Sequence, residues 1–297
     1  MTFFDYLKNI FFILIFLQLA PGIITVIQKQ YGSYLTPSSK VGVISIAGQI
    51  SKSDKYNKLI NKYFKDDSIK AILLKIESPG GASGSAQLIY NEIKQLKKEY
   101  SKPIITLVEN ICTSASYYIA AATDLIIAPP SALIGSIGTS FPYMFQLQEL
   151  MNNYKVNHIP LVAGDFKNAT NPLVPMTNEN KTMLQSLLND SYHKFISDVA
   201  LSRNLNKKEH KKWANGQIFT GQQALALGLV DKIGSGYEAE KIIKDKALIE
   251  DQVEWIKEKQ KKGLLGFLSQ NETGDNESIY SLLTSKIYTA LHNFKIG

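Results

Sequence analysis

The chain has a single cysteine, Cys112, among its 297 residues. One cysteine cannot form an intrachain disulfide, and it excludes a metal site built from several cysteines. Histidine is also scarce, because His158, His193, His210 and His292 lie far apart and show no HExxH or HxH spacing. The sequence therefore gives little support to a histidine-ligated metal.

The chain also lacks a block of charge of one sign. Lys and Arg number 33 and Asp and Glu 26, which gives a net charge of +7 with the lysines scattered among glutamates. This pattern favours a solvated, lysine-rich surface over a nucleic-acid-binding face. A hydrophobic content of 44% with 20% charged residues is ordinary for a globular protein and excludes a mainly disordered, collagen-like or mucin-like chain.

One long apolar run is present near the amino terminus. Residues 10–27 read IFFILIFLQLAPGIITVI, with no charge and one strongly polar residue, Gln18. Roughly 20 apolar residues span a bilayer core, so this run is near the lower limit, and its Pro-Gly pair would bend or end a helix. We favour a retained single-pass signal anchor in contact with membrane lipid, with a cleaved signal peptide or a buried core helix as alternatives. The flanking charges do not set its orientation.

Strand-like and helix-like segments alternate along the rest of the chain. Apolar and β-branched runs predict strands at 41–50, 69–76, 103–108, 124–130 and 159–164, and helical spacing predicts helices at 84–98, 142–153 and 178–203. This alternation predicts an α/β fold with largely parallel strand pairing. We therefore divide the chain into a flank (1–9), the apolar segment (10–27), a linker (28–40), a folded domain (41–256) and a basic, amphipathic tail (257–297).

Two short motifs follow predicted strands and could carry chemistry. The turn at residues 78–81 reads SPGG, and a glycine pair can aim backbone N–H groups at an oxyanion or simply form a turn. Ser114 follows the strand at 103–108 and opens an alanine-rich helix, where a serine is either a cap or a nucleophile. No GxSxG pattern is present, so this is not the α/β-hydrolase signature.

A serine nucleophile needs a base, and no histidine lies at a recognisable spacing from Ser114. A lysine can serve if it is neutral, and burial lowers the lysine pKa. Lys167 follows the strand-like run at 159–164 and fits better than the lysines of the charged helices. Ser136, in the sequence GSIG, is either a turn residue or a group that orients the lysine through a hydrogen bond.

Five blocks occur in the order SPGG, TSASYYIAAATD, GSIG, AGDFKNATNPLVPMT and FTGQQALALGLVDKIG. Together they resemble the bacterial signal peptide peptidase A (SppA) family over about residues 41–245. The resemblance implies a ClpP/crotonase-like spiral of ββα units with an N-terminal transmembrane helix. It also implies Ser114 as nucleophile, Lys167 as general base and Ser136 as the residue that orients the lysine. The N–H groups of Gly81 and Ala115 would form the oxyanion hole.

The same resemblance implies a membrane-anchored serine endopeptidase with a Ser-Lys dyad. Its substrates would be cleaved signal peptides or other membrane-associated peptides, and no metal or organic cofactor is implied. We also expect a homo-oligomer, whose sites could be built from neighbouring subunits. The catalytic domain would lie on the extracytoplasmic side of the inner (cytoplasmic) membrane. Two alternatives remain, which are a catalytically inactive scaffold with this fold and a crotonase-like acyl-CoA enzyme.

The sequence departs from the family pattern at two places. Ala115 and Ser116 stand where the family has Gly-Gly, and Glu77 stands where it has Asn. An alanine would be strained if the backbone there had a positive φ, and Glu77 would bring a charge near the oxyanion pocket. Both changes favour altered specificity or lost activity. Ser116 adds a second hydroxyl, but Ser114 is the serine that aligns with the YYIA block.

Overall fold

The computed structural model describes residues 4, 10–23, 38–141 and 144–258. The chain divides into two compact units, Met1–Lys257 and Glu258–Gly297, and the second lies outside the described residues apart from Glu258. The elements of the first unit are β1 (Ser38–Ala47), α2 (Asp54–Lys65), β2 (Ile69–Ser78), α3 (Ser83–Glu99), β3 (Ile104–Thr113), α4 (Ala115–Ala120), β4 (Leu125–Ala128), β5 (Leu133–Gly135), α5 (Gln148–Asn153), α6 (Asn178–Arg203), the 3-10 helix η1 (Lys207–Lys212), β6 (Ile218–Thr220), α7 (Gly221–Ala226), β7 (Lys232–Ile233), α8 (Gly236–Ala247) and β8 (Gln252–Lys257).

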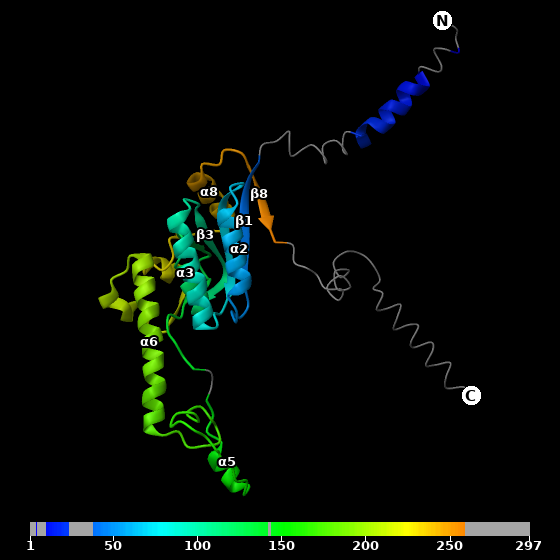
Figure 1. The fold of residues 1–297 in the computed structure, drawn as a ribbon. Helices are drawn as coiled ribbons and strands as arrows, with labels where there is room; N and C mark the ends of the chain where they lie inside the picture. The colour runs from blue at the N-terminus through cyan, green and yellow to red at the C-terminus, as the bar shows by residue number, and fades with distance from the viewer. Residues whose placement is uncertain (1–3, 5–9, 24–37, 142–143, 259–297) are drawn as a thin grey trace, which may run out of the picture. The chain divides into compact units, whose positions relative to one another are not determined.

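Eight strands form one sheet (Figure 1). Its main path runs β6-β5-β3-β2-β1-β8, and off this path β4 pairs with β3 and β7. Every pairing is parallel except that of β5 with β6. The predicted α/β fold with a largely parallel sheet is therefore confirmed.

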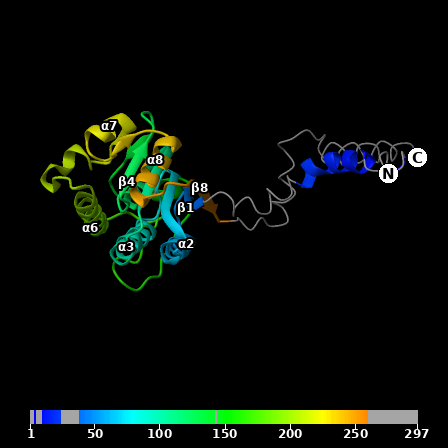
Figure 2. The ribbon, with the colours of Figure 1, turned by 90° about the horizontal axis from the view of Figure 1, so that it is seen from above.

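The central strands are buried on both faces of the sheet. On β2, Ile72, Leu74 and Ile76 belong to the core beneath α2 and α3. The alternate residues Ala71 and Leu73 belong to a second core beneath α8, on the opposite face (Figure 2). Successive side chains of a strand point to opposite faces, so burial on both sides requires a continuous apolar run.

The helices bury one side each. In α2 the buried residues recur at helical spacing and pack on the sheet, and they are Tyr56, Leu59, Ile60, Tyr63 and Phe64. In α6 burial is concentrated in the carboxyl-terminal half, where Phe195, Ile196 and Val199 enter the core. The amino-terminal half of α6 is mostly exposed, with Leu184 as its buried residue.

Most of the predicted elements form. The strands expected at 41–50, 69–76, 103–108 and 124–130 correspond to β1 to β4, and the helices expected at 84–98 and 178–203 to α3 and α6. The helix expected at 142–153 is confirmed for Gln148–Asn153, and residues 142–143 lie outside the described residues.

The prediction of a strand at 159–164 is wrong. These residues form no strand, and Ile159 and Leu161 are 80% and 93% exposed. A strand needs a hydrogen-bonding neighbour, and this apolar run meets none in the part of the chain that the structure describes.

The predicted anchor and the tail are described only in part. Residues 10–23 are helical, and residues 24–27 lie outside the described residues. No helix among the residues that the structure places is long and apolar enough to cross a membrane. β1 begins at Ser38, so residues 38–40 belong to the strand, and the tail beyond residue 258 lies outside the described residues.

Candidate active site

Ser114 sits at the junction of β3 and α4 in an unusual backbone conformation. Its φ is 54° and its ψ is −125°, a combination that residues with a Cβ rarely adopt. Its N–H donates to the Gly135 carbonyl at 2.7 Å, and its own carbonyl accepts from the Tyr118 N–H at 3.0 Å. The half-buried hydroxyl makes no hydrogen bond with any described residue. The fold therefore fixes the backbone of Ser114 and leaves its Oγ unengaged.

The glycine pair after β2 packs directly against Ser114. Gly80 has a φ of 107°, and a Cβ on it would lie 2.8 Å from Ser114 Cβ and 2.9 Å from Ala115 N. Gly81 has a φ of 153°, and a Cβ there would lie 2.1 Å from the Ile50 carbonyl oxygen. Only glycine fits at either position. The sequence analysis singled out the SPGG turn but gave Gly80 no role of its own in the site.

Two backbone N–H groups beside Ser114 remain unengaged. Within the described part of the chain, neither the Gly81 N–H nor the Ala115 N–H donates a hydrogen bond. The Gly80 N–H is used, since it donates to Ser78 Oγ at 3.2 Å. Unengaged N–H groups next to a nucleophile are what an oxyanion hole requires.

The neighbouring nucleophilic groups are not available for chemistry. Ser116 is fully buried, and its Oγ lies 2.7 Å from the Ser78 carbonyl and 2.8 Å from the Thr113 carbonyl. Burial raises the pKa of the Cys112 thiol to about 12, so it is not a thiolate near neutral pH. Among these residues, Ser114 alone presents an unengaged nucleophile.

The two departures from the family pattern have little effect on this geometry. The positive φ falls on Ser114 and not on Ala115, so the strain considered for an alanine does not arise. The Glu77 side chain accepts a hydrogen bond from Asn110 Nδ2 at 2.8 Å.

Ser136 lies close to Ser114, whereas no described hydrogen bond joins Lys167 to either serine. Ser136 has a φ of 48° and directly follows Gly135, whose carbonyl holds the Ser114 N–H. Lys167 is exposed, and its side chain makes no hydrogen bond or ion pair with any residue that the structure places. The described contacts thus link four of the five expected site residues, and none of them involves the Lys167 side chain.

Helix α4 is tied to α6 by a buried polar contact that the sequence did not indicate. The Tyr118 hydroxyl donates to the Asp198 carboxylate, and its ring stacks on Phe195 with centroids 4.5 Å apart. Lys194 pairs with Asp198 at 2.7 Å. Burial, and then the hydrogen bond to Asp198, raises the pKa of Tyr118. This contact holds α4, the helix that directly follows Ser114, against α6.

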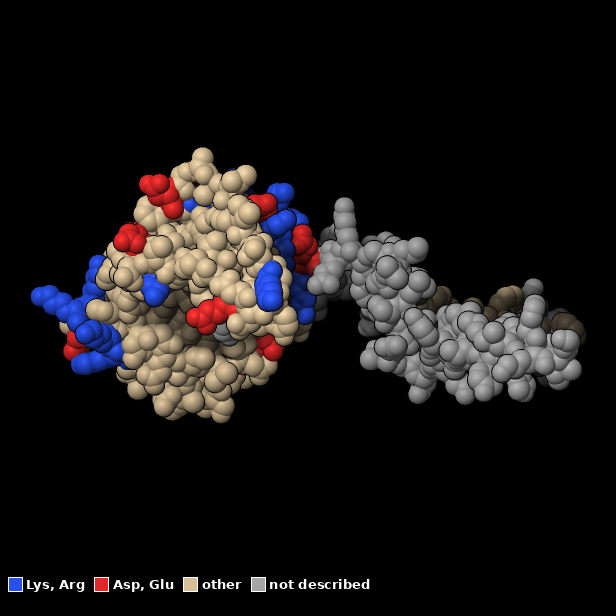
Figure 3. All heavy atoms as spheres, turned by 90° about the horizontal axis from the view of Figure 1, so that it is seen from below, with Lys and Arg blue, Asp and Glu red and all other residues tan. Residues whose placement is uncertain are grey.

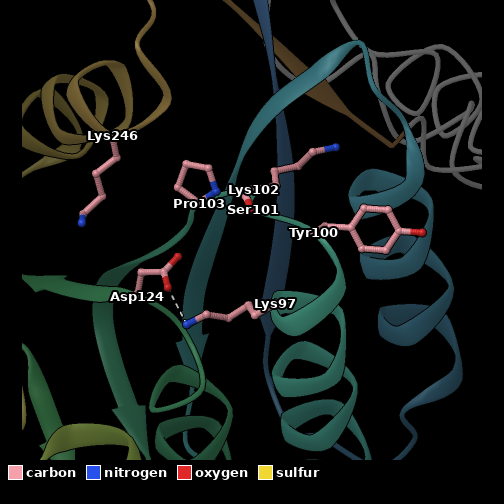
Figure 4. A pocket seen from close by; sticks show the side chains of 7 residues that line it. All are labelled: Lys97, Tyr100, Ser101, Lys102, Pro103, Asp124 and Lys246. Atoms are coloured by element: carbon pink, nitrogen blue, oxygen red, sulfur yellow. Dashed lines mark ion pairs between the residues drawn. The ribbon is translucent and has the colours of Figure 1, made fainter.

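A separate cavity of about 420 Å³ lies at the opposite end of β3 (Figure 4). Three lysines line it, but two are engaged in structure. Lys102 Nζ donates to the carbonyls of Tyr63, Phe64 and Asp66, and Lys97 Nζ pairs with Asp124 at 2.5 Å. Within the described residues, no group of three His, Cys, Asp or Glu side chains could hold a metal ion.

A family model described as Peptidase family S49 matches residues 96–250, more than half of the chain. The chain belongs to peptidase family S49. The matched range contains Ser114, Ser136 and Lys167, and it begins after the Gly80–Gly81 turn. The resemblance to the SppA family is confirmed.

Three relatives illustrate this membership. A Methanocaldococcus jannaschii protein named "Putative protease MJ0651" is 34% identical over 213 residues, which are 71% of this chain and 67% of that protein. Protease 4 of Haemophilus influenzae is 28% identical over 278 residues, or 88% of this chain and 44% of that protein. The chloroplastic serine protease SPPA of Arabidopsis thaliana is 29% identical over 224 residues, or 75% and 31%. Family and relatives together support a serine protease.

Proposed function

We propose that the protein is a serine endopeptidase in which Ser114 is the nucleophile and Lys167 the general base. The observation that carries the proposal is the backbone at Ser114, held at a φ of 54° with the unengaged N–H groups of Gly81 and Ala115 beside it. Strained backbone of this kind persists where the surroundings over-determine it and where function uses it.

The reaction follows from these groups. Lys167, as the neutral amine, takes the proton from Ser114 Oγ, which attacks the carbonyl carbon of a peptide bond. The oxyanion that forms accepts hydrogen bonds from the Gly81 and Ala115 N–H groups. The C–N bond then breaks, the leaving amine receives the proton from Lys167, and water hydrolyses the acyl-enzyme with Lys167 again as base.

Lys167 would reach Ser114 from a neighbouring subunit of a homo-oligomer. The segment around Lys167 exposes apolar side chains that a water-facing surface would not gather, namely Met144, Phe145, Leu147, Leu150, Tyr154, Val156, Ile159, Leu161, Val162 and Phe166. Figure 3 shows the end of the molecule where α5 lies, with most charged side chains toward the margin. A second copy of the chain on this surface would bury the apolar residues and deliver the lysine.

The uncharged run at residues 10–27 would anchor this oligomer in the inner (cytoplasmic) membrane, with the catalytic domain on the extracytoplasmic side. Substrates would then be cleaved signal peptides or other membrane-associated peptides, and the parallel sheet would be part of a ClpP/crotonase-like spiral. The absence of charge over residues 10–27 is the feature of the sequence that supports this arrangement.

Co-expression of two inactive variants tests the shared site. Purified full-length wild type is expected to hydrolyse casein or a fluorogenic peptide, and Ser114→Ala and Lys167→Ala are each expected to be inactive. In a ring of randomly mixed variants, about a quarter of the interfaces would join an intact serine to an intact lysine, so about a quarter of the activity should return.

The controls separate the possible failures. Lys167→Arg should stay inactive, because arginine remains charged. Activity in Lys167→Arg would contradict the base assignment, and no recovery in the mixed assembly would contradict the shared site. A folded, assembled wild type without activity would favour the inactive scaffold.

A further inference from the structure

The two N–H groups of the candidate oxyanion hole are aimed by hydrogen bonds on the far side of their own peptide units. The Gly81 N–H shares a peptide unit with the carbonyl of the preceding glycine, which accepts from the Ile50 N–H at 2.8 Å. The Ala115 N–H shares one with the carbonyl of the preceding serine, which accepts from the Tyr118 N–H at 3.0 Å. Both units are trans, so their N–H and C=O groups point in opposite directions. Each bond to a carbonyl therefore fixes the direction of the N–H on the other side.

These bonds do not set the distance between the two N–H groups, because the groups belong to different segments of the chain. Gly81 lies in the turn between β2 and α3, and Ala115 is the first residue of α4. One oxyanion accepts from both donors only if each N–H lies about 2.7–3.1 Å from it. A contact between the turn and the start of α4 must therefore set the spacing.

Two buried hydroxyls make that contact, and we call Thr113 and Ser116 the buried hydroxyl pair. The Ser116 Oγ lies 2.7 Å from the Ser78 carbonyl oxygen and 2.8 Å from the Thr113 carbonyl oxygen, so its one hydrogen is shared between them. The Thr113 Oγ1 donates to the Pro79 carbonyl at 3.1 Å. The pair thus brackets the nucleophile in the sequence and reaches two consecutive carbonyls of the turn.

Burial makes these two contacts persistent. Ser116 is fully buried and Thr113 is 3% exposed, so neither hydroxyl can exchange its protein partner for bulk water. The turn is also held from its other side, because the Ser78 Oγ accepts from the Gly80 N–H at 3.2 Å and donates to the Gly48 carbonyl at 2.6 Å. The turn is therefore fixed between the loop after β1 and the start of α4.

We propose that Thr113 and Ser116 are positioning residues of the oxyanion hole, whose hydroxyls hold the Gly81 and Ala115 N–H groups at the spacing that one oxyanion needs. The inference rests on the proposed peptidase function and adds two residues to it. Both hydroxyls are engaged with backbone carbonyls, so they act through the backbone and not on the substrate.

Loss of a positioning contact should lower kcat and leave KM nearly unchanged. Negative charge develops on the carbonyl oxygen in the transition state, so the two donors contribute most to that state. Complete loss of one oxyanion donor lowers kcat by about 10²–10³-fold, and a displaced donor should cost less, about tenfold to a hundredfold. KM should stay within about twofold of wild type, because binding of the ground state depends little on these donors.

Substitutions that remove one hydroxyl with little change in size test this role in the full-length protein. Thr113→Val and Ser116→Ala should each lower kcat for a fluorogenic peptide by about tenfold or more. Thr113→Ser, which restores the hydroxyl, should recover most of the kcat that Thr113→Val loses. The matched control is Thr106→Val on the same strand, where the hydroxyl is fully buried and lies 3.0 Å from that of Thr123. It should lower Tm and keep the wild-type kcat.

The control and the rescue separate positioning from a general loss of structure. A wild-type kcat in both Thr113→Val and Ser116→Ala overturns the proposal, and so does an equal fall of kcat in Thr106→Val. If Thr113→Val does not fold, Ser116→Ala against Thr106→Val decides the question.

Phosphonate labelling separates failure of this inference from failure of the proposed function. In a wild type that is labelled at Ser114 but cleaves no peptide, the labelling rates of the variants take the place of kcat, because the phosphonyl oxygen uses the same two donors. A folded wild type that neither cleaves a peptide nor is labelled at Ser114 overturns the peptidase function itself, and the positioning role with it.

Discussion

Gly80→Ala is the substitution that this structure predicts to be most damaging beside Ser114. A Cβ on Gly80 would lie 2.8 Å from both Ser114 Cβ and the Thr113 carbonyl oxygen, and 2.9 Å from Ala115 N. Two of these atoms belong to the backbone, so no side-chain rotation relieves the clash. The φ of 107° adds strain for any residue with a Cβ.

The size of the effect follows from these two costs. Positive-φ strain and overpacking each cost about 1–3 kcal/mol, so we expect a loss of about 4 kcal/mol in the free energy of unfolding. For a domain of this size that corresponds to a fall of about 12 °C in Tm. Below the new Tm, the displaced Ser114 should react about a hundredfold more slowly, because small misplacements of reacting groups are costly.

A serine-directed fluorophosphonate and a thermal melt measure both effects. The matched control is Gly84→Ala in α3, where nothing lies within 4 Å of the added Cβ. Its labelling rate should equal that of wild type, and its stability should be unchanged or higher by up to about 1 kcal/mol. A Gly80→Ala protein with wild-type labelling and Tm would refute this account of the turn.

Further predictions concern the surroundings of Ser114. Tyr118→Phe leaves the buried Asp198 without one donor and should cost about 1–3 kcal/mol in a denaturant melt. Tyr237→Phe, at a side chain that is 75% exposed, should not change the free energy of unfolding measurably. If the two variants were equally stable, the stabilising role of the Tyr118 hydrogen bond would be contradicted. Cys112 should resist iodoacetamide at pH 8 when folded and react in urea, since burial raises its pKa to about 12. The thiol of the unfolded chain ionises from about pH 8.5, whereas the buried thiol stays protonated, so the free energy of unfolding should fall as pH rises above that value. Rapid alkylation of the folded protein would contradict the burial of Cys112.

Much of the sheet could be predicted because burial on both faces leaves a visible pattern. The run at 69–76 is apolar except for Lys70 and Lys75, and β2 lies between two cores. The run at 159–164, IPLVAG, is also mostly apolar, yet it forms no strand, since composition does not say whether a neighbouring strand exists. The helix at Asp54–Lys65 was not among the predicted elements, although its apolar residues recur at helical spacing.

The sequence offered candidate residues for the site but not the geometry in which they lie. Nothing in the sequence marks Ser114 as a serine with a φ of 54°, because a positive φ outside glycine depends on the surrounding contacts. The Tyr118–Asp198 contact joins residues 80 positions apart, and no local pattern links them. The pairing of Lys167 with Ser114 stays a prediction, since no described contact joins the two residues.

The most direct measurement is the site of phosphonate labelling in the full-length protein. The protein is treated with a fluorophosphonate and digested, and the modified residue is located by mass spectrometry. We predict modification at Ser114, with none at the buried Ser116 and none in Ser114→Ala. A folded wild type that stays unlabelled, or a label on Ser116, would contradict the assignment of Ser114 as the nucleophile.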